Sequence, residues 1–259
     1  MNYGLYLSAS GMMTNLYRQD VFANNLANVE TAGFKQHVPT IKARAPASIE
    51  DNLGINAAKP MLDKLGGGAL AGPDRISFGA AKLTKTGNPL DAALTDKNTF
   101  FAVQSTDDNG NPSVALTRNG NFSRNSEGQL VTQTGHRVLN AQNQPINVPG
   151  NAPVRINGAG QIIQDDQPVD QLQVARIENT QQLSKQGGGL FTMEQPQQRE
   201  VLENPAVKAG FVEASGVNPI KTLSQLISAT KSATGNANMI RYHDRMMEQA
   251  VAQLGRVQG

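Results

Sequence analysis

The sequence has no cysteine and no tryptophan, and aromatic residues make up only 5% of its 259 residues. Without cysteine, disulfide frameworks, cysteine-ligated zinc and cysteine nucleophiles are excluded. The apolar share of 38% is below that of an ordinary globular domain, whereas glycine is frequent with 25 residues. This composition is typical of a β-rich or extended protein with small interfaces, not of an enzyme with a dense core.

Charge of one sign and long apolar runs are also lacking. The formal net charge is +2, and lysine and arginine form no cluster, which argues against binding to nucleic acid. No apolar run approaches the roughly 20 residues that span a membrane. The N-terminus lacks the basic and apolar regions of a cleaved secretory signal. On physical grounds alone, these features favour a cytoplasmic protein that does not span a membrane.

The motifs of common catalytic and cofactor sites are lacking too. The three histidines lie far apart in sequence and stand in no metalloprotease motif. The acidic stretch 107–111 lacks the ligand spacing and the closing glutamate of a calcium loop. Asp165 and Asp166 would point to opposite faces of a strand, so they do not converge on one bond. We therefore expect no enzyme activity, no catalytic residues, no metal, no cofactor and no small-molecule substrate.

An amphipathic helix is expected from about Tyr3 to Asn28. Its apolar residues alternate at spacings of four and three, interrupted only by Gln19, and this heptad pattern favours a coiled-coil seam. Gly4 and Gly11 weaken the helix, so it needs a partner to be stable. The expected contact residues in its stripe are Leu5, Met12, Leu16 and Leu26.

A second helix is expected from Asn218 to about Leu254. Asn218 is a favourable N-cap, and Pro219 suits the first helical position. The apolar spacing of three and four continues with only two polar exceptions. At about 1.5 Å per residue the helix is roughly 50 Å long, too long for a domain of this size to bury alone. Its expected interface residues are Asn218, Leu223, Leu226, Ile240, Met247, Val251 and Leu254.

Between the helices the pattern changes twice. Over 36–75 proline and glycine recur, which favours an extended connector. Over 76–209 short β-type runs alternate with turn signals, which is typical of an all-β sandwich or partial barrel. The strongest turn signal, Asn119-Gly120, predicts a hairpin between 114–118 and 121–124. Other strands are expected at 99–103, 130–132, 154–156 and 172–177.

The expected fold class is therefore α+β. Long N- and C-terminal helices pair in a coiled-coil-like manner, and an all-β middle domain is joined to them by the connector. The expected domains are a terminal helical core of 1–35 with 210–259, the extended connector 36–75, and a β-rich outer domain 76–209.

The stretch from Asn24 to Lys35 lies at the end of the first helix. Asn24 and Asn28 are four residues apart and share a helical face, with Asn25 between them. Gly33 suits a left-handed position just past a helix end, and Phe34 can pack back on the last turn. One interpretation is an ordinary helix terminus with polar decoration; the other is that these amides bind a neighbouring chain.

The string NNLANVETAGFK, which is this same stretch, resembles the N-terminal signature of bacterial flagellar axial proteins, the rod and hook family. That signature reads close to NNLANxxTxGFK. TGNPLD at 86–91 and TRNGNF at 117–122 resemble further motifs of the family, and 210–218 resembles its GxLExSNVN. The sequence departs from the family at Asn98-Thr99, where Asp-Gly is expected, and at Gly216, where the family has asparagine.

The resemblance implies a structural subunit of the flagellar basal-body rod. Its terminal helices would polymerise into the hollow drive shaft that transmits motor torque. It would be exported by the flagellar type III apparatus, without a cleaved signal, to the periplasmic rod. Its partners would be other copies of itself and neighbouring rod, hook or hook-basal-body proteins. We then expect the subunit interface to include Asn24, Asn25, Asn28, Gly33 and Phe34.

Two other functions stay open. A hook-type protein of the same family is one, although the chain is short and shows no extra outer domain. A secreted β-domain that binds cell-wall glycan, with the helices as dimerisation arms, is the other. Within the rod class, the Asn218-Pro219 junction and a loosely matched C-terminal helix favour the proximal over the distal rod.

Overall fold

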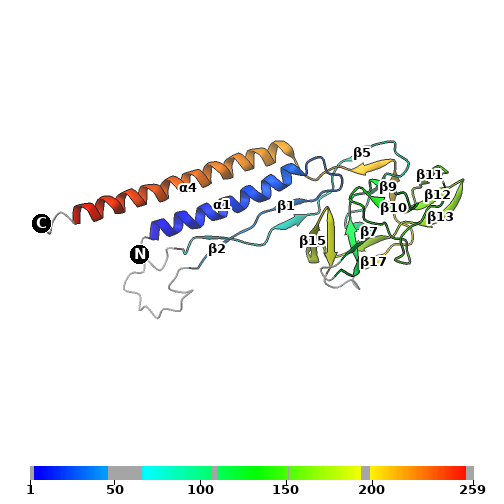
Figure 1. Ribbon diagram of the computed structural model, residues 1–259, viewed down its shortest axis with the longest axis horizontal. Helices are drawn as coiled ribbons and strands as arrows, with labels where there is room; N and C mark the ends of the chain where they lie inside the picture. Colours follow the sequence, from blue (N-terminus) through cyan, green and yellow to red (C-terminus); the bar gives the residue numbers. More distant parts are fainter. Residues whose placement is uncertain (1–2, 46–65, 107–109, 151, 194–198, 255–259) are drawn as a thin grey trace. The chain divides into compact units, whose positions relative to one another are not determined.

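The structure is a computed structural model that describes residues 3–45, 66–106, 110–150, 152–193 and 199–254. These residues form two compact units (Figure 1). The helical unit comprises 3–27, 37–45, 66–75 and 218–254. The β unit comprises 28–36 and the described part of 76–217.

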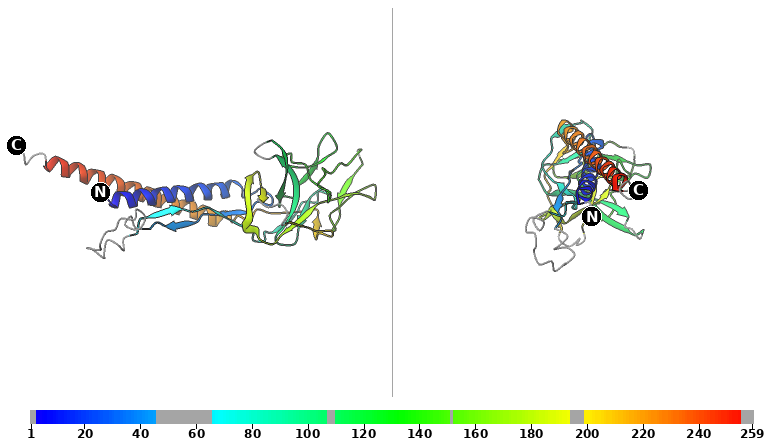
Figure 2. Two further views of the ribbon diagram at one scale, coloured as in Figure 1. Left: turned by 90° about the horizontal axis from the view of Figure 1, so that it is seen from below. Right: turned by 90° about the vertical axis from the view of Figure 1, so that its left-hand side faces the viewer.

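The helical unit is built on α1 (Tyr3–Ala27) and α4 (Pro219–Leu254), which lie side by side in both Figure 1 and Figure 2. Both helices begin and end within one residue of the ranges expected from the sequence. The cap is also confirmed: Asn218 Oδ1 accepts a hydrogen bond of 3.0 Å from the backbone N–H of Lys221. It satisfies one of the donors that a helix start leaves free.

The two helices run antiparallel in a constant register. Gly4 of α1 lies against the ring of His243, and Gly11 lies against the amide of Asn236. Both pairs are seven residues apart on each helix, as heptad packing requires. The buried side chains of the pair are small or polar apart from one phenylalanine: Thr14, Phe22, Asn25, Thr222, Ala229 and Ala233.

The described ends of the connector lie along α1. β2 (Ile41–Ala43) and β3 (Ala69–Ala71) form an antiparallel pair. The hydroxyls of Ser10 and Thr14 donate to the carbonyl of Ala69. Tyr17 donates to the carbonyl of Gly72 at 3.0 Å. β1 (Gln36–Val38) pairs with β4 (Arg75–Ser77). The described ends of the connector thus contain short strands, and residues 46–65 lie outside the described residues.

The β unit contains one six-stranded antiparallel sheet and several smaller ones. The order in the large sheet is β15 (Leu183–Gly187), β16 (Leu190–Met193), β8 (Pro112–Thr117), β7 (Thr99–Thr106), β14 (Val174–Ile177) and β17 (Arg199–Val201). A three-stranded sheet is formed by β11 (Val154–Ile156), β12 (Gln161–Gln164) and β13 (Gln167–Gln171). The two-stranded pairs are β9 (Phe122–Arg124) with β10 (Leu130–Thr132), β5 (Leu83–Lys85) with β19 (Phe211–Glu213), and β6 (Ala92–Leu94) with β18 (Val207–Ala209). A short 3-10 turn, η1 (Thr180–Gln182), precedes β15.

The prediction of a hairpin at Asn119-Gly120 is wrong. β8 pairs with β7 and β16, and β9 pairs with β10, so the two strands that flank this turn are not partners. Gly120 is needed for a different reason: a Cβ there would stand 1.6 Å from the carbonyl oxygen of Ala92. The dipeptide is the place where the chain leaves the large sheet for the β9–β10 pair.

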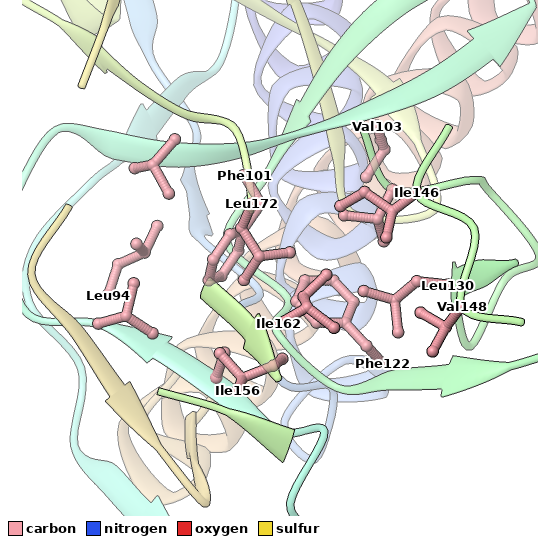
Figure 3. Close-up of a cluster of buried hydrophobic side chains, with 14 of the residues drawn as sticks. Leu94, Phe101, Val103, Phe122, Leu130, Ile146, Val148, Ile156, Ile162 and Leu172 are labelled. Carbon is pink, nitrogen blue, oxygen red and sulfur yellow. The ribbon is translucent and has the colours of Figure 1, made fainter. Parts of the chain in front are cut away.

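The β unit has two apolar clusters that meet at β7. Phe101 points into the cluster of Figure 3 and meets Phe122 edge to face, with ring centroids 5.1 Å apart. Its neighbour Phe100 points to the opposite face and packs near Phe191, at 5.8 Å between centroids. Because the first half of β7 is buried on both faces, residues 100–103 form a continuous apolar run and do not alternate with polar residues. The α+β class, with packed terminal helices and a central β region, is confirmed.

Candidate functional site

The described part of the chain holds no group of three side chains that could bind a metal ion. Neither of its long helices carries an apolar stretch long enough to cross a membrane. The candidate functional site comprises the exposed surfaces of the helices and the stretches of the β unit that continue in sequence into them.

The outer surfaces of both helices carry large apolar side chains. On α1, Met13 is 69% exposed, and Tyr6 and Leu16 are also exposed. Burying such a side chain contributes about 1.5–3 kcal/mol, so these surfaces are suited to contact with another protein. On α4 the exposed apolar side chains form a starting group of Ile220, Leu223 and Ile227 and a distal group of Met239, Tyr242, Met246, Met247 and Val251.

The residues expected from the apolar stripe divide between two surfaces. Leu5, Met12 and Leu26 of α1 are half-buried, as are Leu226 and Ile240 of α4. Leu16, Leu223, Met247 and Val251 are exposed, and Asn218 is exposed at its cap position. The side chain of Leu254 lies outside the described residues. The half-buried group faces the helix pair's own seam, and the exposed group faces outward.

The helix register leaves one end of α4 extending beyond α1. Because Gly4 lies against His243, the described start of α1 at Tyr3 lies level with about residue 244. Residues 245–254 continue past it for about 15 Å at 1.5 Å per residue. This overhang carries Met246, Met247 and Val251, the last of which is 66% exposed.

The three asparagines of the first motif have different environments. Asn25 is fully buried; its Nδ2 donates to the carbonyl of His37 at 2.7 Å, and its Oδ1 accepts from the backbone N–H of His37 at 2.9 Å. Asn28 accepts at 3.2 Å from the hydroxyl of Thr31. Asn24 is exposed. The amide of Asn25 is thus engaged within its own chain.

Gly33 and Phe34 belong to the β unit. Gly33 has φ +68°, but it follows the end of α1 at Ala27 by six residues, so it is not the helix cap expected from the sequence. A Cβ at Gly33 would lie 2.4 Å from the carbonyl carbon of Arg118. Phe34 is buried, and the ammonium of Lys185 lies 4.4 Å from its ring centroid.

Next to Gly33 lies a buried ionic network that was not anticipated from the sequence. The carboxylate of Glu213 accepts from Lys35 Nζ at 2.7 Å and from Arg118 Nε at 2.7 Å. All three side chains are at most 5% exposed. The backbone N–H of Ala81 also donates to Glu213, at 3.3 Å. We call Lys35, Arg118 and Glu213 the ionic network.

The surroundings shift the pKa of two members of the network. Burial raises the pKa of Glu213, but the nearby Arg118 and Lys35 outweigh it and hold this pKa below its usual value of 4.5. Burial lowers the pKa of Lys35, Arg118 adds to this effect, and Glu213 opposes it. Both directions follow from two cations that share one buried carboxylate.

Each member of the network lies in one of the stretches that resemble flagellar axial proteins. Lys35 ends NNLANVETAGFK, Arg118 lies in TRNGNF, and Glu213 lies in the stretch 210–218. Buried charges are costly unless they are paired, and the presence of a charged residue in each of these three stretches was the available signal. Their spacing in sequence did not indicate that they meet.

Two packed terminal helices with outward apolar surfaces, joined in sequence to a β-rich unit, define a structural protein that acts through its surfaces. Three family models match the chain. Residues 5–35 match flagella basal body rod protein, residues 96–164 match the flagellar hook protein FlgE/F/G D1 domain, and residues 208–254 match the flagellar basal body rod FlgEFG protein C-terminal model.

Similar proteins are found over nearly the whole length. The chain is 31% identical to flagellar basal-body rod protein FlgG of Caulobacter vibrioides, over 96% of this chain and 98% of the relative. It is 27% identical to FlgF of Mesorhizobium japonicum, over 98% and 99%, and 28% identical to FlgG of Bacillus subtilis, over 95% and 97%. The chain belongs to the flagellar basal-body rod protein family, which is structural and not enzymatic.

Proposed function

We propose that the chain polymerises through its terminal helices into the hollow drive shaft of the basal-body rod, which transmits motor torque. The observation that supports this most directly is the apolar outer surface of the helix pair. Met13, Ile220 and Val251 are all more than half exposed in the single chain. A shaft made of packed copies would bury these side chains.

The arrangement of the exposed groups on α4 favours an open filament over a closed dimer. The starting group and the distal group are different patches at opposite ends of one helix. When one patch of a copy binds a different patch of the next copy, the contact is head-to-tail, and it generates a helical filament if the rotation does not close. The overhang at 245–254 supplies the end that reaches the next copy.

The proposed interface keeps the residues expected from the sequence and divides their roles. The exposed members contact other copies directly, while the half-buried members hold the helix pair together and Asn25 acts by fixing the chain at His37. The direct contacts are Leu16, Asn24, Asn218, Leu223, Met247 and Val251, and Leu254 is added to them from its place in the sequence stripe. The residues that hold the helix pair are Leu5, Met12, Leu26, Leu226, Ile240 and Asn25. Asn28, Gly33 and Phe34 lie in the β unit, and they support the interface by fixing the stretch that follows α1.

The remaining features of the proposal rest on family membership. The helical core of 1–35 with 210–259 would form the inner tube, with the β-rich domain 76–209 outside it and 36–75 connecting them. The protein would be exported by the flagellar type III apparatus without a cleaved signal, and would join copies of itself and neighbouring rod, hook or hook-basal-body proteins. We favour the proximal rod because of the Asn218-Pro219 junction. Rod-protein relatives of matching length favour a rod over a hook-type protein.

The substitution Leu223→Asp tests the assembly surface. Leu223 is exposed, so the free protein should keep its fold while a charge on the outer surface prevents packing with a neighbour. A strain that carries only this variant should not swim, and its purified basal bodies should lack the protein. Ser224→Asp is the matched control, because Ser224 is the next residue of α4, is also exposed, and receives the same charge and helix propensity. Normal incorporation of Leu223→Asp would contradict the proposal.

Deletion of Pro219–Gly259 tests the wider claim that the terminal helices carry assembly. The truncated chain lacks α4 entirely, and it should still be synthesised but should not enter basal bodies. Labelling the β unit allows both forms to be followed by electron microscopy. A truncated chain found at normal levels in the rod would mean that the β unit, not the helix pair, directs assembly.

A further inference from the structure

The ionic network lies where the β unit continues into both helices. Lys35 belongs to the stretch 28–36 that follows α1, and Glu213 ends β19, shortly before α4 begins at Pro219. Two backbone hydrogen bonds join the same stretches directly. Gly33 N–H donates to the carbonyl of Glu213 at 2.7 Å, and Gly216 N–H donates to the carbonyl of Phe34 at 2.9 Å. The network and these bonds form one junction.

The charges of the junction do not balance. Two buried cations meet one carboxylate, and within the described residues Glu213 is the only acid in ion-pair distance of either cation. The remaining partners are neutral oxygens: Lys35 donates to the carbonyl of Gly79 at 3.0 Å, and Arg118 donates to the carbonyls of Thr99 and Asp96 at 2.6 and 2.8 Å. Removing one member of a buried ion pair leaves the other charge uncompensated. Glu213 is therefore the residue that compensates the buried charges of both Lys35 and Arg118.

We propose that Glu213 is a charge-operated latch. While it is ionised, it holds the stretches 33–35 and 213–216 to Arg118; when it is neutral, the two cations repel each other and both stretches detach while the apolar core of the β unit stays folded. This device is independent of the proposed function, because it concerns the closed and open states of a single chain.

The core is able to stay folded because its stabilising contacts lie elsewhere. The two apolar clusters are made of other side chains. Arg118, which lies 5.9 Å from the ring centroid of Phe100, is also held by the carbonyls of Thr99 and Asp96 and stays in place when the latch opens. The stretches held by the latch have little other regular structure: 28–36 is mostly turn, and among the described strands β19 pairs only with the three-residue strand β5. Local opening of weakly packed segments below the global unfolding free energy is common in proteins.

The pH at which the latch opens follows from its surroundings. The charged groups that face Glu213 are Lys35 and Arg118, and both stabilise its ionised form. Its pKa therefore lies below 4.5, so the latch is closed at neutral pH and opens only in acid. Glu213→Gln imitates the protonated form at neutral pH.

Hydrogen exchange of the full-length chain at neutral pH tests the latch. In Glu213→Gln, amides in peptides that cover 28–36 and 211–217 should exchange at least tenfold faster than in the wild type. Peptides that cover β7 should exchange at the wild-type rate. Glu178→Gln removes a negative charge from an exposed position of the same unit and is the matched control; it should change neither region. Wild-type exchange of 28–36 in Glu213→Gln would overturn the proposal.

Variants at Lys35 separate charge repulsion from the simple loss of hydrogen bonds. Lys35→Met leaves one cation with one carboxylate, so its protection should stay within about threefold of the wild type. Lys35→Met combined with Glu213→Gln leaves a single cation held by carbonyls, and it should recover most of the protection that Glu213→Gln loses. If the double variant exchanges as fast as Glu213→Gln, or faster, the charge-operated latch is wrong.

If Glu213→Gln alone does not fold, Lys35→Met and the double variant Lys35→Met with Glu213→Gln still test the latch. A double variant that folds and protects 28–36 supports the latch, because removing the second cation then rescues the chain. A double variant that fails to fold while Lys35→Met folds normally overturns it, since Glu213 would then be required for global folding and not for a local junction.

Discussion

The backbone of Gly11 in α1 lies against the side chain of Asn236 in α4, so that a methyl group at Gly11 would stand 2.8 Å from the amide nitrogen. Gly4 and His243 repeat this relationship one heptad away, at 2.9 Å. Two glycines that weaken an isolated helix thus make space for two polar side chains of the partner helix. They set which residues of α1 and α4 meet.

Replacing Gly11 with leucine should therefore disturb the helix pair. The larger side chain cannot share the space with Asn236, and overpacking of this kind costs about 1–3 kcal/mol. We expect the helical signal in circular dichroism at 222 nm to be lost at a lower temperature than in the wild type, with the β unit unfolding as before. An unchanged helical transition would mean that the register does not depend on this contact.

Gly235 provides the matched control on the partner helix. It is exposed in α4, and nothing lies within 4 Å of a Cβ added there. Gly235→Ala should stabilise the helix by about 0.5–1 kcal/mol, because alanine has the higher helix propensity. Opposite shifts of the same helical transition in Gly11→Leu and Gly235→Ala are the expected result.

Asn25 and Asn24 should respond differently to truncation. Asn25→Ala removes two hydrogen bonds to the backbone of His37 in a fully buried position. Leaving such groups unsatisfied costs about 1–3 kcal/mol, and urea unfolding should detect this loss. Asn24 is exposed, so Asn24→Ala should change the unfolding free energy by less than about 0.5 kcal/mol and should act on rod assembly instead. Equal losses of stability in both variants would contradict this division.

Features that depend on neighbouring residues were predictable from the sequence. The heptad spacing identified both helices, and the Asn218-Pro219 pair identified the start of α4. The strands at 130–132 and 154–156 were found with the observed bounds. In each case the sequence pattern and the element that it predicts span the same residues, so local propensity and the apolar pattern were sufficient to predict the element.

Features that depend on distant residues were not predictable in this way. Asn119-Gly120 has the composition of a hairpin turn, yet the backbone of Ala92 lies against Gly120 and the next strand pairs elsewhere. Lys35 and Glu213 are separated by 178 positions in the sequence. Their ion pair follows from the folded arrangement of three separate stretches, and neither composition nor periodicity reports such an arrangement.

The close approach at Gly120 leads to a prediction of its own. Gly120→Ala places a Cβ 1.6 Å from the carbonyl oxygen of Ala92, so the backbone must move at the entrance to β6. We expect a loss of more than about 3 kcal/mol, at the upper end for single substitutions. Gly135→Ala is the control: Gly135 has φ +85° but nothing within 4 Å of its Cβ position, so only conformational strain of about 1–2 kcal/mol is expected. Similar losses in urea unfolding would show that the contact with Ala92 relaxes freely.

The pH dependence of stability should report on Glu213. Its pKa in the folded protein lies below the usual 4.5, because Arg118 and Lys35 outweigh the effect of burial. A carboxyl group whose pKa is depressed by folding contributes stability above its unfolded pKa, and this contribution is lost as the pH falls through the folded pKa. The difference in unfolding free energy between the wild type and Glu213→Gln should therefore be constant from about pH 6 to 7 and shrink below about pH 4.5.

Urea unfolding at pH 7, 6, 5, 4 and 3 measures this difference, and all other carboxyl groups cancel because both proteins carry them. Glu178→Gln, compared with the wild type in the same series, should give a small difference at every pH because Glu178 is exposed. A difference for Glu213→Gln that stays the same from pH 7 to pH 3 would mean that the carboxylate gains nothing from its two buried cations, and the ionic network would then be held by its hydrogen bonds alone.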